Sequence, residues 1–222
     1  MGDEVMRILA STTAGTGHFM PMVPILSASR DAGHDVLVAC PDSFAATVED
    51  EGFTPAPFDD APQEEWGAVM SGLPGLPADE ANRIVVAEVF GRIDTTAALP
   101  RLASTMARWR PDLVLRDPSE FASWLLVAHM SLPSVRVSIS LLSLDRTFAD
   151  AAADALQSLP AAEGLPVDAA ALTCGDVLAA APATFDPPLE TWTSRCTGTR
   201  SRCCRHRGGR MRFPAATSRS ST

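Results

Sequence analysis

The chain has 222 residues and a formal net charge of −9, and 46% of its residues are hydrophobic. This size suits one domain with a tail, and no apolar run reaches the ~18 residues of a membrane span. The first dozen residues also lack the charged start and apolar stretch of a secretory signal, so we expect a cytoplasmic protein.

The charge is distributed unevenly along the chain. Residues 1–190 hold all 27 acidic residues and ten arginines, a net charge of −17, whereas residues 191–222 hold eight arginines and no acid. An acidic body argues against nucleic acid as a partner. We therefore expect a folded domain over 1–190 and a disordered tail over 191–222. The tail is either the product of a shifted reading frame, which we favour, a basic interaction arm, or a metal knuckle of Cys and His.

Strand and helix patterns alternate from the start of the chain. The first elements predicted are a strand over 6–11, a Thr/Gly loop over 12–17, a helix over 21–33, and a strand over 35–40. Asp42 can cap the helix that follows, which should end at Gly52. The body cysteines, Cys40 and Cys174, are expected to be reduced and structural.

Later segments continue the alternation. We predict a weak strand over 53–58, a long loop over 59–78, a long helix over 78–110 broken or kinked at Pro100, a strand over 112–115, a helix over 119–131, a strand over 134–139, further helices near 145–158 and 168–173, and an extended segment over 180–189. Such alternation predicts an α/β fold with a Rossmann-like doubly wound parallel sheet. Its functional loops should follow the strand ends, at 12–20, 40–43, 116–120 and 140–144.

The first of these loops carries the most specific motif. It reads A-G-T-G-H-F-M-P-M-V-P from Ala14 to Pro24. A dinucleotide-binding fingerprint needs a third small residue where Met20 stands, which disfavours NAD or FAD. The alternative begins with His18, because an imidazole titrates near neutral pH and can accept a proton from a hydroxyl.

Several motifs together resemble one enzyme family. They are G-H-x-x-P-x-x-P in the first loop, A-G-H-D-V at 32–36, A-C-P at 39–41, E-G-F at 51–53, R-P-D-L-V-L-R-D at 110–117 and L-P-S-V at 132–135. In this order they resemble the glycosyltransferases of the GT-B fold that decorate natural products, bacterial antibiotic glycosyltransferases above all. The likeness covers roughly residues 5–190 and implies the N-terminal, acceptor-binding domain.

The resemblance implies roles for individual residues. It makes His18 the catalytic base of an inverting sugar transfer, with Asp117 after the fourth strand as the partner that orients it. Without the resemblance, His18 could be a surface residue, and Asp117 or Ser119 could cap the next helix. His34 is expected to be structural, and His129, in an apolar helix, to lie in the core or at an interface.

The implied acceptor is a lipophilic small molecule held in an apolar cleft. Candidate lining residues are Phe19, Met20, Trp66, Met70, Phe90, Phe121 and Ser140.

The resemblance implies no metal and no cofactor, since a UDP- or dTDP-sugar would be a co-substrate. In the family that donor binds a second domain, for which this sequence shows no motif, so we expect no donor binding unless a C-terminal domain is supplied. The alternatives are a non-catalytic acceptor-binding module and a nonfunctional fragment.

Overall fold

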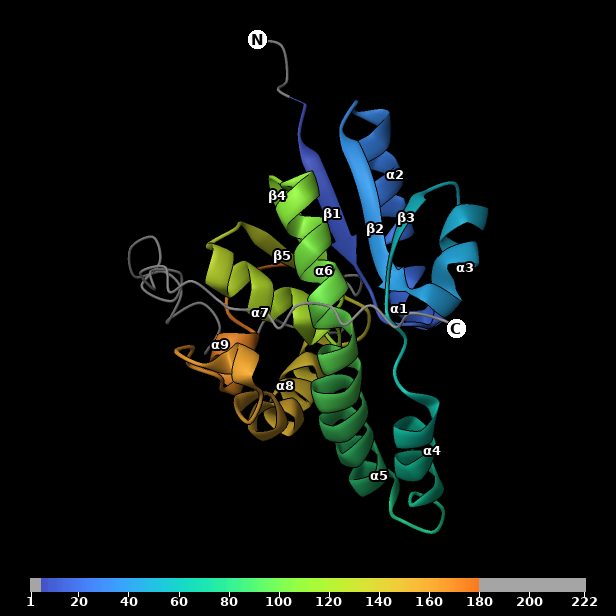
Figure 1. The fold of residues 1–222 in the computed structure, drawn as a ribbon, viewed down its shortest axis with the longest axis vertical. Coiled ribbons are helices and arrows are strands. Elements are labelled where there is room, and N and C mark those ends of the chain that lie inside the picture. Colours follow the sequence, from blue (N-terminus) through green and yellow to red (C-terminus); the bar gives the residue numbers. More distant parts are fainter. Residues whose placement is uncertain (1–4, 180–222) are drawn as a thin grey trace, which may run out of the picture.

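A six-stranded parallel sheet forms the centre of the molecule (Figure 1), in a computed structural model that describes residues 5–179. The strand order is β3-β2-β1-β4-β5-β6, and every neighbouring pair is parallel. The strands are β1 Arg7–Ser11, β2 Asp35–Pro41, β3 Thr54–Phe58, β4 Leu113–Arg116, β5 Ser134–Ser138 and β6 Asp176–Ala179. The predicted doubly wound parallel fold is confirmed. The predicted tail and the segment 180–189 lie outside the described residues.

Helices cover both faces of the sheet because the strands are apolar on both sides. Leu9 belongs to one core cluster, whereas its neighbours Ile8 and Ala10 belong to the other, as the two-residue period of a strand requires. The helices between β1 and β3 are α1 Thr16–Phe19, α2 Val23–Asp31, the 3₁₀ turn η1 Asp42–Phe44 and α3 Ala45–Asp50. Phe19, Leu26 and Val48 from these helices pack against Ile8 and Ala10.

The other core cluster is larger and is covered by the helices that follow β3. They are α4 Gln63–Ser71, α5 Ala78–Ile84, the π-helix η2 Val85–Asp94, α6 Thr95–Trp109, α7 Phe121–Met130, α8 Leu142–Gln157, the 3₁₀ turn η3 Pro160–Ala162 and α9 Ala169–Leu172. In Figure 1, α4 and α5 extend beyond the ends at which the strands finish. These helices therefore form a separate wall beside the carboxyl edge of the sheet, where the functional loops were predicted.

The prediction of a long loop over 59–78 is wrong, because α4 occupies the middle of this segment. Glu64 and Glu65 stand in the first turn of α4, where the helix dipole favours acids, and Gly72 ends it. The helix packs on η2. The prolines that suggested a loop stand outside the helix, and Gly67 lies within it.

The long helix predicted over 78–110 is not broken at Pro100. Helix α6 runs through Pro100, and the irregularity lies upstream, in the π-helical η2. The hydroxyl of Thr95 donates to the Phe90 carbonyl at 2.7 Å, across the junction of the two helices. The π-helical η2 packs extensively against α8.

Two smaller expectations also change. The side chain of Asp42 does not cap the following helix but pairs with Arg101 at 2.8 Å, because the chain enters η1 through Pro41 and the carboxylate faces α6. A sixth strand, β6, was not predicted at Asp176–Ala179. Neither Cys40 nor Cys174 forms a disulfide within residues 5–179, as expected.

Candidate active site

The loop after β1 places His18 at the carboxyl edge of the sheet. His18 lies in the short helix α1. The residue after it, Phe19, is fully buried and packs edge-on against the rings of Phe44 and Phe53. Gly15 precedes this helix with a φ of 152°, and a Cβ there would lie 3.3 Å from the imidazole Cδ2. The loop therefore needs glycine at this position, and Phe19 anchors the helix that presents His18.

Asp117 follows β4 directly and is fully buried. Its amide donates to the Ser11 carbonyl at 3.0 Å, which joins the ends of β1 and β4. One carboxylate oxygen, Oδ1, accepts from the Ser119 amide at 2.8 Å. The other, Oδ2, accepts from the Thr13 hydroxyl at 3.1 Å and from the Thr13 amide at 3.3 Å. Helix α7 is capped by Glu120 instead, so neither Asp117 nor Ser119 serves as its cap.

His18 and Asp117 meet although 99 residues separate them. The imidazole Nδ1 lies 2.8 Å from Oδ2 of Asp117, and the exposed fractions of the two side chains are 22% and 0%. A carboxylate at Nδ1 assigns the proton to that nitrogen and leaves Nε2 as the acceptor. Nε2 makes no hydrogen bond to any residue in the described part of the chain. The predicted contact is confirmed, while the roles of the two residues stay predictions.

The electrostatics favour a charged pair. Burial by itself lowers the pKa of His18, but the hydrogen bond that His18 donates to Asp117 and the charges of Asp117 and Asp94 outweigh it, and the pKa is raised. Burial would raise the pKa of Asp117, but His18 and the amides of Ser119 and Thr13 hold it below its usual value. Asp117 thus remains anionic at neutral pH and can stabilise an imidazolium that forms beside it.

A small cavity adjoins this pair. It lies among β2, β3, η2, α6 and the start of α7, and both Thr13 and Phe90 line it. The Phe90 ring is 5.6 Å from the imidazole of His18, centroid to centroid. The remaining lining residues are Pro41, Phe58, Asp94, Thr95, Ala98, Ser119, Glu120 and Phe121.

The predicted acceptor residues fall into four groups. Phe90 lies beside His18, and Phe121, only 2% exposed, lines the same cavity. Met20, 41% exposed, lies two residues beyond His18, and Ser140 is half-buried after β5. Phe19 belongs to the core.

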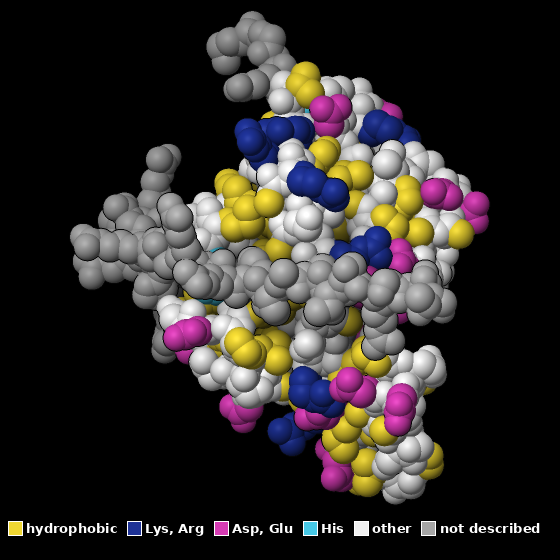
Figure 2. Space-filling view, viewed as in Figure 1, with side chains coloured by type: hydrophobic (Ala, Val, Ile, Leu, Met, Phe, Trp, Pro, Cys, Tyr) yellow, Lys and Arg dark blue, Asp and Glu magenta, His cyan; other side chains and the backbone are white. Residues whose placement is uncertain are grey.

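The last two candidates lie on the wall of helices. Trp66, 38% exposed, and the half-buried Met70 lie on α4, which packs on the helix that carries Phe90. Figure 2 shows hydrophobic side chains exposed between charged ones over α4 and α5.

Sequence reasoning missed three polar residues of this region. Thr13 and Glu120 stand in loops that the parallel topology singles out, so the strand-end rule is the signal that could have found them. Asp94 gives no such signal, because it ends a helix and reaches the site only through the packing of η2.

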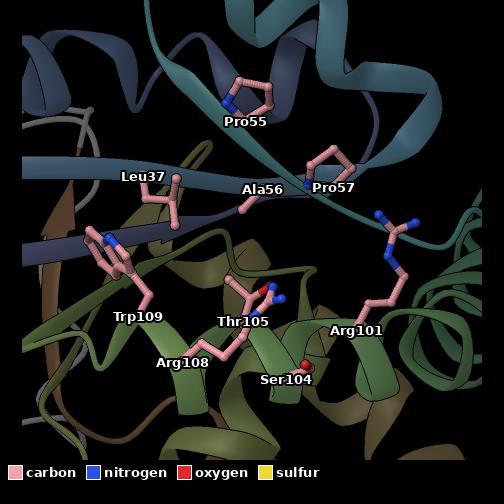
Figure 3. Close-up of a pocket in the computed structure, with 9 residues that line it drawn as sticks. All are labelled: Leu37, Pro55, Ala56, Pro57, Arg101, Ser104, Thr105, Arg108 and Trp109. Carbon is pink, nitrogen blue, oxygen red and sulfur yellow. The ribbon is translucent and has the colours of Figure 1, made fainter. Parts of the chain in front are cut away.

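A larger open groove lies elsewhere, between the edge strand β3 and α6 (Figure 3). Its volume is about 620 Å³, and it shares no residue with the cavity beside His18. Pro55 and Pro57 lie on one side of it, and Arg101, Arg108 and Trp109 on the other. The groove contains neither member of the His18–Asp117 pair and is separate from the candidate active site.

Residues 5–179 contain neither a metal-binding cluster of side chains nor a membrane-spanning helix. No group of three or more His, Cys, Asp or Glu side chains is placed to hold a metal ion. No helix in this range combines the length and the apolar character needed to cross a membrane.

Comparisons with known proteins identify similar chains. No protein-family model matches. The L-demethylnoviosyl transferase of Streptomyces niveus is 34% identical over 141 residues, which are 62% of this chain and 35% of that protein. The 4'-demethylrebeccamycin synthase of Lentzea aerocolonigenes is 37% identical over 142 residues, 61% of this chain and 32% of that protein. The matched region therefore spans about a third of the length of these relatives.

Solved structures agree with the sequence matches. The glycosyltransferase SsfS6 of Streptomyces sp. SF2575 superposes with a TM-score of 0.63 and 25% identity, covering 82% of this chain and 52% of that one. A second structure of the same protein, complexed with thymidine diphosphate, gives a TM-score of 0.60 at 26% identity and covers 78% of this chain and 48% of that one. The fold shared is about half of each solved chain.

Proposed function

Because the homologues of this chain are bacterial antibiotic glycosyltransferases and its structural neighbours are glycosyltransferases, we propose that it forms the acceptor side of an inverting sugar transfer. In this reaction the hydroxyl oxygen of a lipophilic small molecule attacks the anomeric carbon of a nucleotide-diphosphate sugar. The bond from that carbon to the diphosphate breaks, and the diphosphate leaves. The observation that carries the proposal is the 2.8 Å contact between His18 and the buried carboxylate of Asp117.

His18 acts as the base in this proposal. Its Nε2 accepts the hydroxyl proton as the oxygen attacks, because Nδ1 already carries a proton and faces Asp117. The imidazole is 22% exposed at the carboxyl edge of the sheet, so a substrate can reach it. The imidazolium that forms lies beside the Asp117 carboxylate. This carboxylate is buried, and three further hydrogen bonds hold it in place.

The acceptor would lie between His18 and the wall made by η2 and α4. Phe90 already contacts the imidazole, and Met20, Trp66 and Met70 offer further apolar surface on the two sides. Flat aromatic and flexible thioether side chains suit a hydrophobic aglycone.

In this proposal the donor binds a domain that corresponds to the half of the relatives that this chain does not match. The chain covers 48% of the SsfS6 structure that holds thymidine diphosphate. We propose a UDP- or dTDP-sugar as co-substrate, bound by a second domain that closes over His18, with no metal or cofactor in the transfer. The proposal for this chain alone is acceptor binding.

The test replaces His18 with Ala in the chain joined to the donor-binding domain of a related glycosyltransferase. Transfer should slow by about 10²–10⁴ in kcat, the usual contribution of a general base, while acceptor affinity and folding change little. His34→Ala is the matched control, since His34 lies before β2 at the opposite edge of the sheet. Its kcat should equal that of the parent enzyme. Parent activity in His18→Ala would exclude His18 as the base and leave acceptor binding as the function.

A further inference from the structure

The cavity beside His18 has properties that sugar transfer does not require. It leaves about 20 Å³ for the centres of water-sized groups, and ~10–15 Å³ on that measure hold one water. It therefore admits one small head group, while the rest of a ligand would remain outside, next to His18 and Phe90.

Two carboxyl groups face this space. Glu120 is 4% exposed, and its carboxylate oxygens accept from the Ser123 amide at 3.1 and 3.2 Å, with further side-chain hydrogen bonds to Ser123 and Ser11. Asp94 is half-buried and makes no hydrogen bond or ion pair with another residue of 5–179. Burial, then the charges of Glu120 and Asp60, raise the pKa of Asp94 to about 7, against the opposing effect of His18. Burial also raises the pKa of Glu120, and the charge of Asp117 adds to this shift.

Ser119 supplies an independent indication of a ligand. The residue lines the cavity and is 1% exposed, yet its hydroxyl has no hydrogen-bond partner in the described chain. A buried hydroxyl without a partner costs free energy unless another group satisfies it. A donor placed in the cavity could bond to this oxygen.

Aromatic rings complete the lining. Phe58, Phe90 and Phe121 all border the same space. Rings attract cations through their negative faces, and the attraction grows where water is excluded. The space thus has carboxylates, a hydroxyl acceptor and aromatic rings around it. This combination suits a cation with several N–H donors.

We propose that this cavity, lined by Asp94, Ser119 and Glu120, is a subsite for a protonated amine. The ammonium head donates to the Asp94 carboxylate and the Ser119 hydroxyl, and the remainder of the ligand extends toward His18. The inference rests on the proposed function only for the source of the amine, which is either the acceptor or the sugar being transferred.

A neutral head group fits less well. A hydroxyl can bond to Ser119, but it leaves Asp94 and Glu120 as two carboxyls near each other without a counter-charge. His18 provides little compensation, because its nearest anion is Asp117 at 2.8 Å. A metal ion is disfavoured, since no metal-holding group of side chains exists within residues 5–179.

The experiment measures binding to the isotopically labelled chain by NMR at about pH 8, above the Asp94 pKa of about 7. Benzylamine is compared with benzyl alcohol, and glucosamine with glucose. At least one amine should shift the amide signals of Ser119 and Glu120 and bind about tenfold tighter than its hydroxyl counterpart, the usual scale of a charge-assisted hydrogen bond. The first pair represents an amine on the acceptor and the second an amine on the sugar.

Two variants locate the binding. Asp94→Asn should reduce the affinity for the amine about tenfold and leave the hydroxyl probe unchanged. Asp154→Asn is the matched control, because it removes an equal charge from an exposed position on α8. Ser119→Ala gives a second variant with the charges intact and should weaken the amine by a smaller factor. The amide spectrum away from the cavity shows whether each variant is folded.

The pH dependence has a definite sign. Amine binding should strengthen as the pH rises through about 7, because Asp94 becomes charged there. Equal affinity of both amines and their hydroxyl counterparts, or an unchanged amine affinity in folded Asp94→Asn, would overturn the inference. Binding of the amine with undiminished transfer in His18→Ala would instead reject the catalytic proposal and leave this subsite standing.

Discussion

Two groups of buried charges lie at the ends of neighbouring strands, and only one of them has a side chain that a ligand can reach. Arg116 and Asp117 are adjacent in sequence, yet the two-residue period of the strand directs them into different groups. Asp117 pairs with His18, which is 22% exposed. Arg116 lies with Arg136 and Asp145, all three about 2% exposed.

The second group holds the fold together. Arg136 pairs with Asp145 on α8 at 3.1 Å and donates to the Thr173 carbonyl at 2.9 Å. Arg116 donates to the Leu172 carbonyl at 2.7 Å. Both carbonyls lie at the end of α9, where a helix needs donors. Burial and then the charge of Arg136 lower the pKa of Arg116 to about 9, so the guanidinium remains charged at neutral pH. A buried ionic group at a strand end is thus a candidate site only when one member is accessible.

The largest effect on stability should follow from breaking the inaccessible pair. Asp145→Ala leaves the guanidinium of Arg136 buried without its carboxylate, and the free energy of unfolding should fall by about 3–5 kcal/mol. The control, Asp150→Ala, removes a 63% exposed partner of Arg146 and should cost ~0–1 kcal/mol. Urea denaturation measures both. Equal losses would remove the distinction between a buried pair and an exposed one.

Asp117→Asn should act mainly on activity, in the enzyme joined to a donor domain. The amide can no longer stabilise an imidazolium, so transfer should slow about 10-fold to 10³-fold, less than in His18→Ala. The double variant should be little slower than His18→Ala, because residues that act as one unit are not additive. Steady-state kinetics of the three variants measures this. Additive losses would show that the two side chains act separately.

The smallest effect expected is a shift in pH dependence. Only neutral His18 can accept a proton, and its pKa is raised above 6.5, so kcat/KM should fall as the pH drops through this raised value. Asp117→Asn removes the hydrogen bond and the charge that raise the pKa, and burial then lowers it. The acidic limb of the profile should move to lower pH. A limb that stays in place, or moves to higher pH, would contradict the pairing inferred from the structure.

The acidic residues near His18, which are Asp94, Asp117 and Glu120, illustrate what a motif cannot predict. The resemblance carried by the G-H motif and by R-P-D-L-V-L-R-D singled out His18 and Asp117, and the ends of β1 and β4 do meet at one edge of the sheet. The strand-end rule selected the loop that contains Ser119 and Glu120, but it did not indicate that they face a cavity. The position of Asp94 could not be predicted in this way, because Asp94 does not follow a strand. It is placed by the π-helix η2, which packs against α8.

By itself, the sequence determined the parallel sheet, since apolar strands alternating with amphipathic helices have one efficient way to bury both faces of a sheet. It also determined that His18 and Asp117 would lie at the same edge. Only the tertiary structure decided that α4 forms where a loop was expected and that α6 continues through Pro100. It likewise placed Phe19 in the core and Asp94 beside His18. These features depend on contacts between segments far apart in the chain, whose energies outweigh the local preferences that a sequence pattern records.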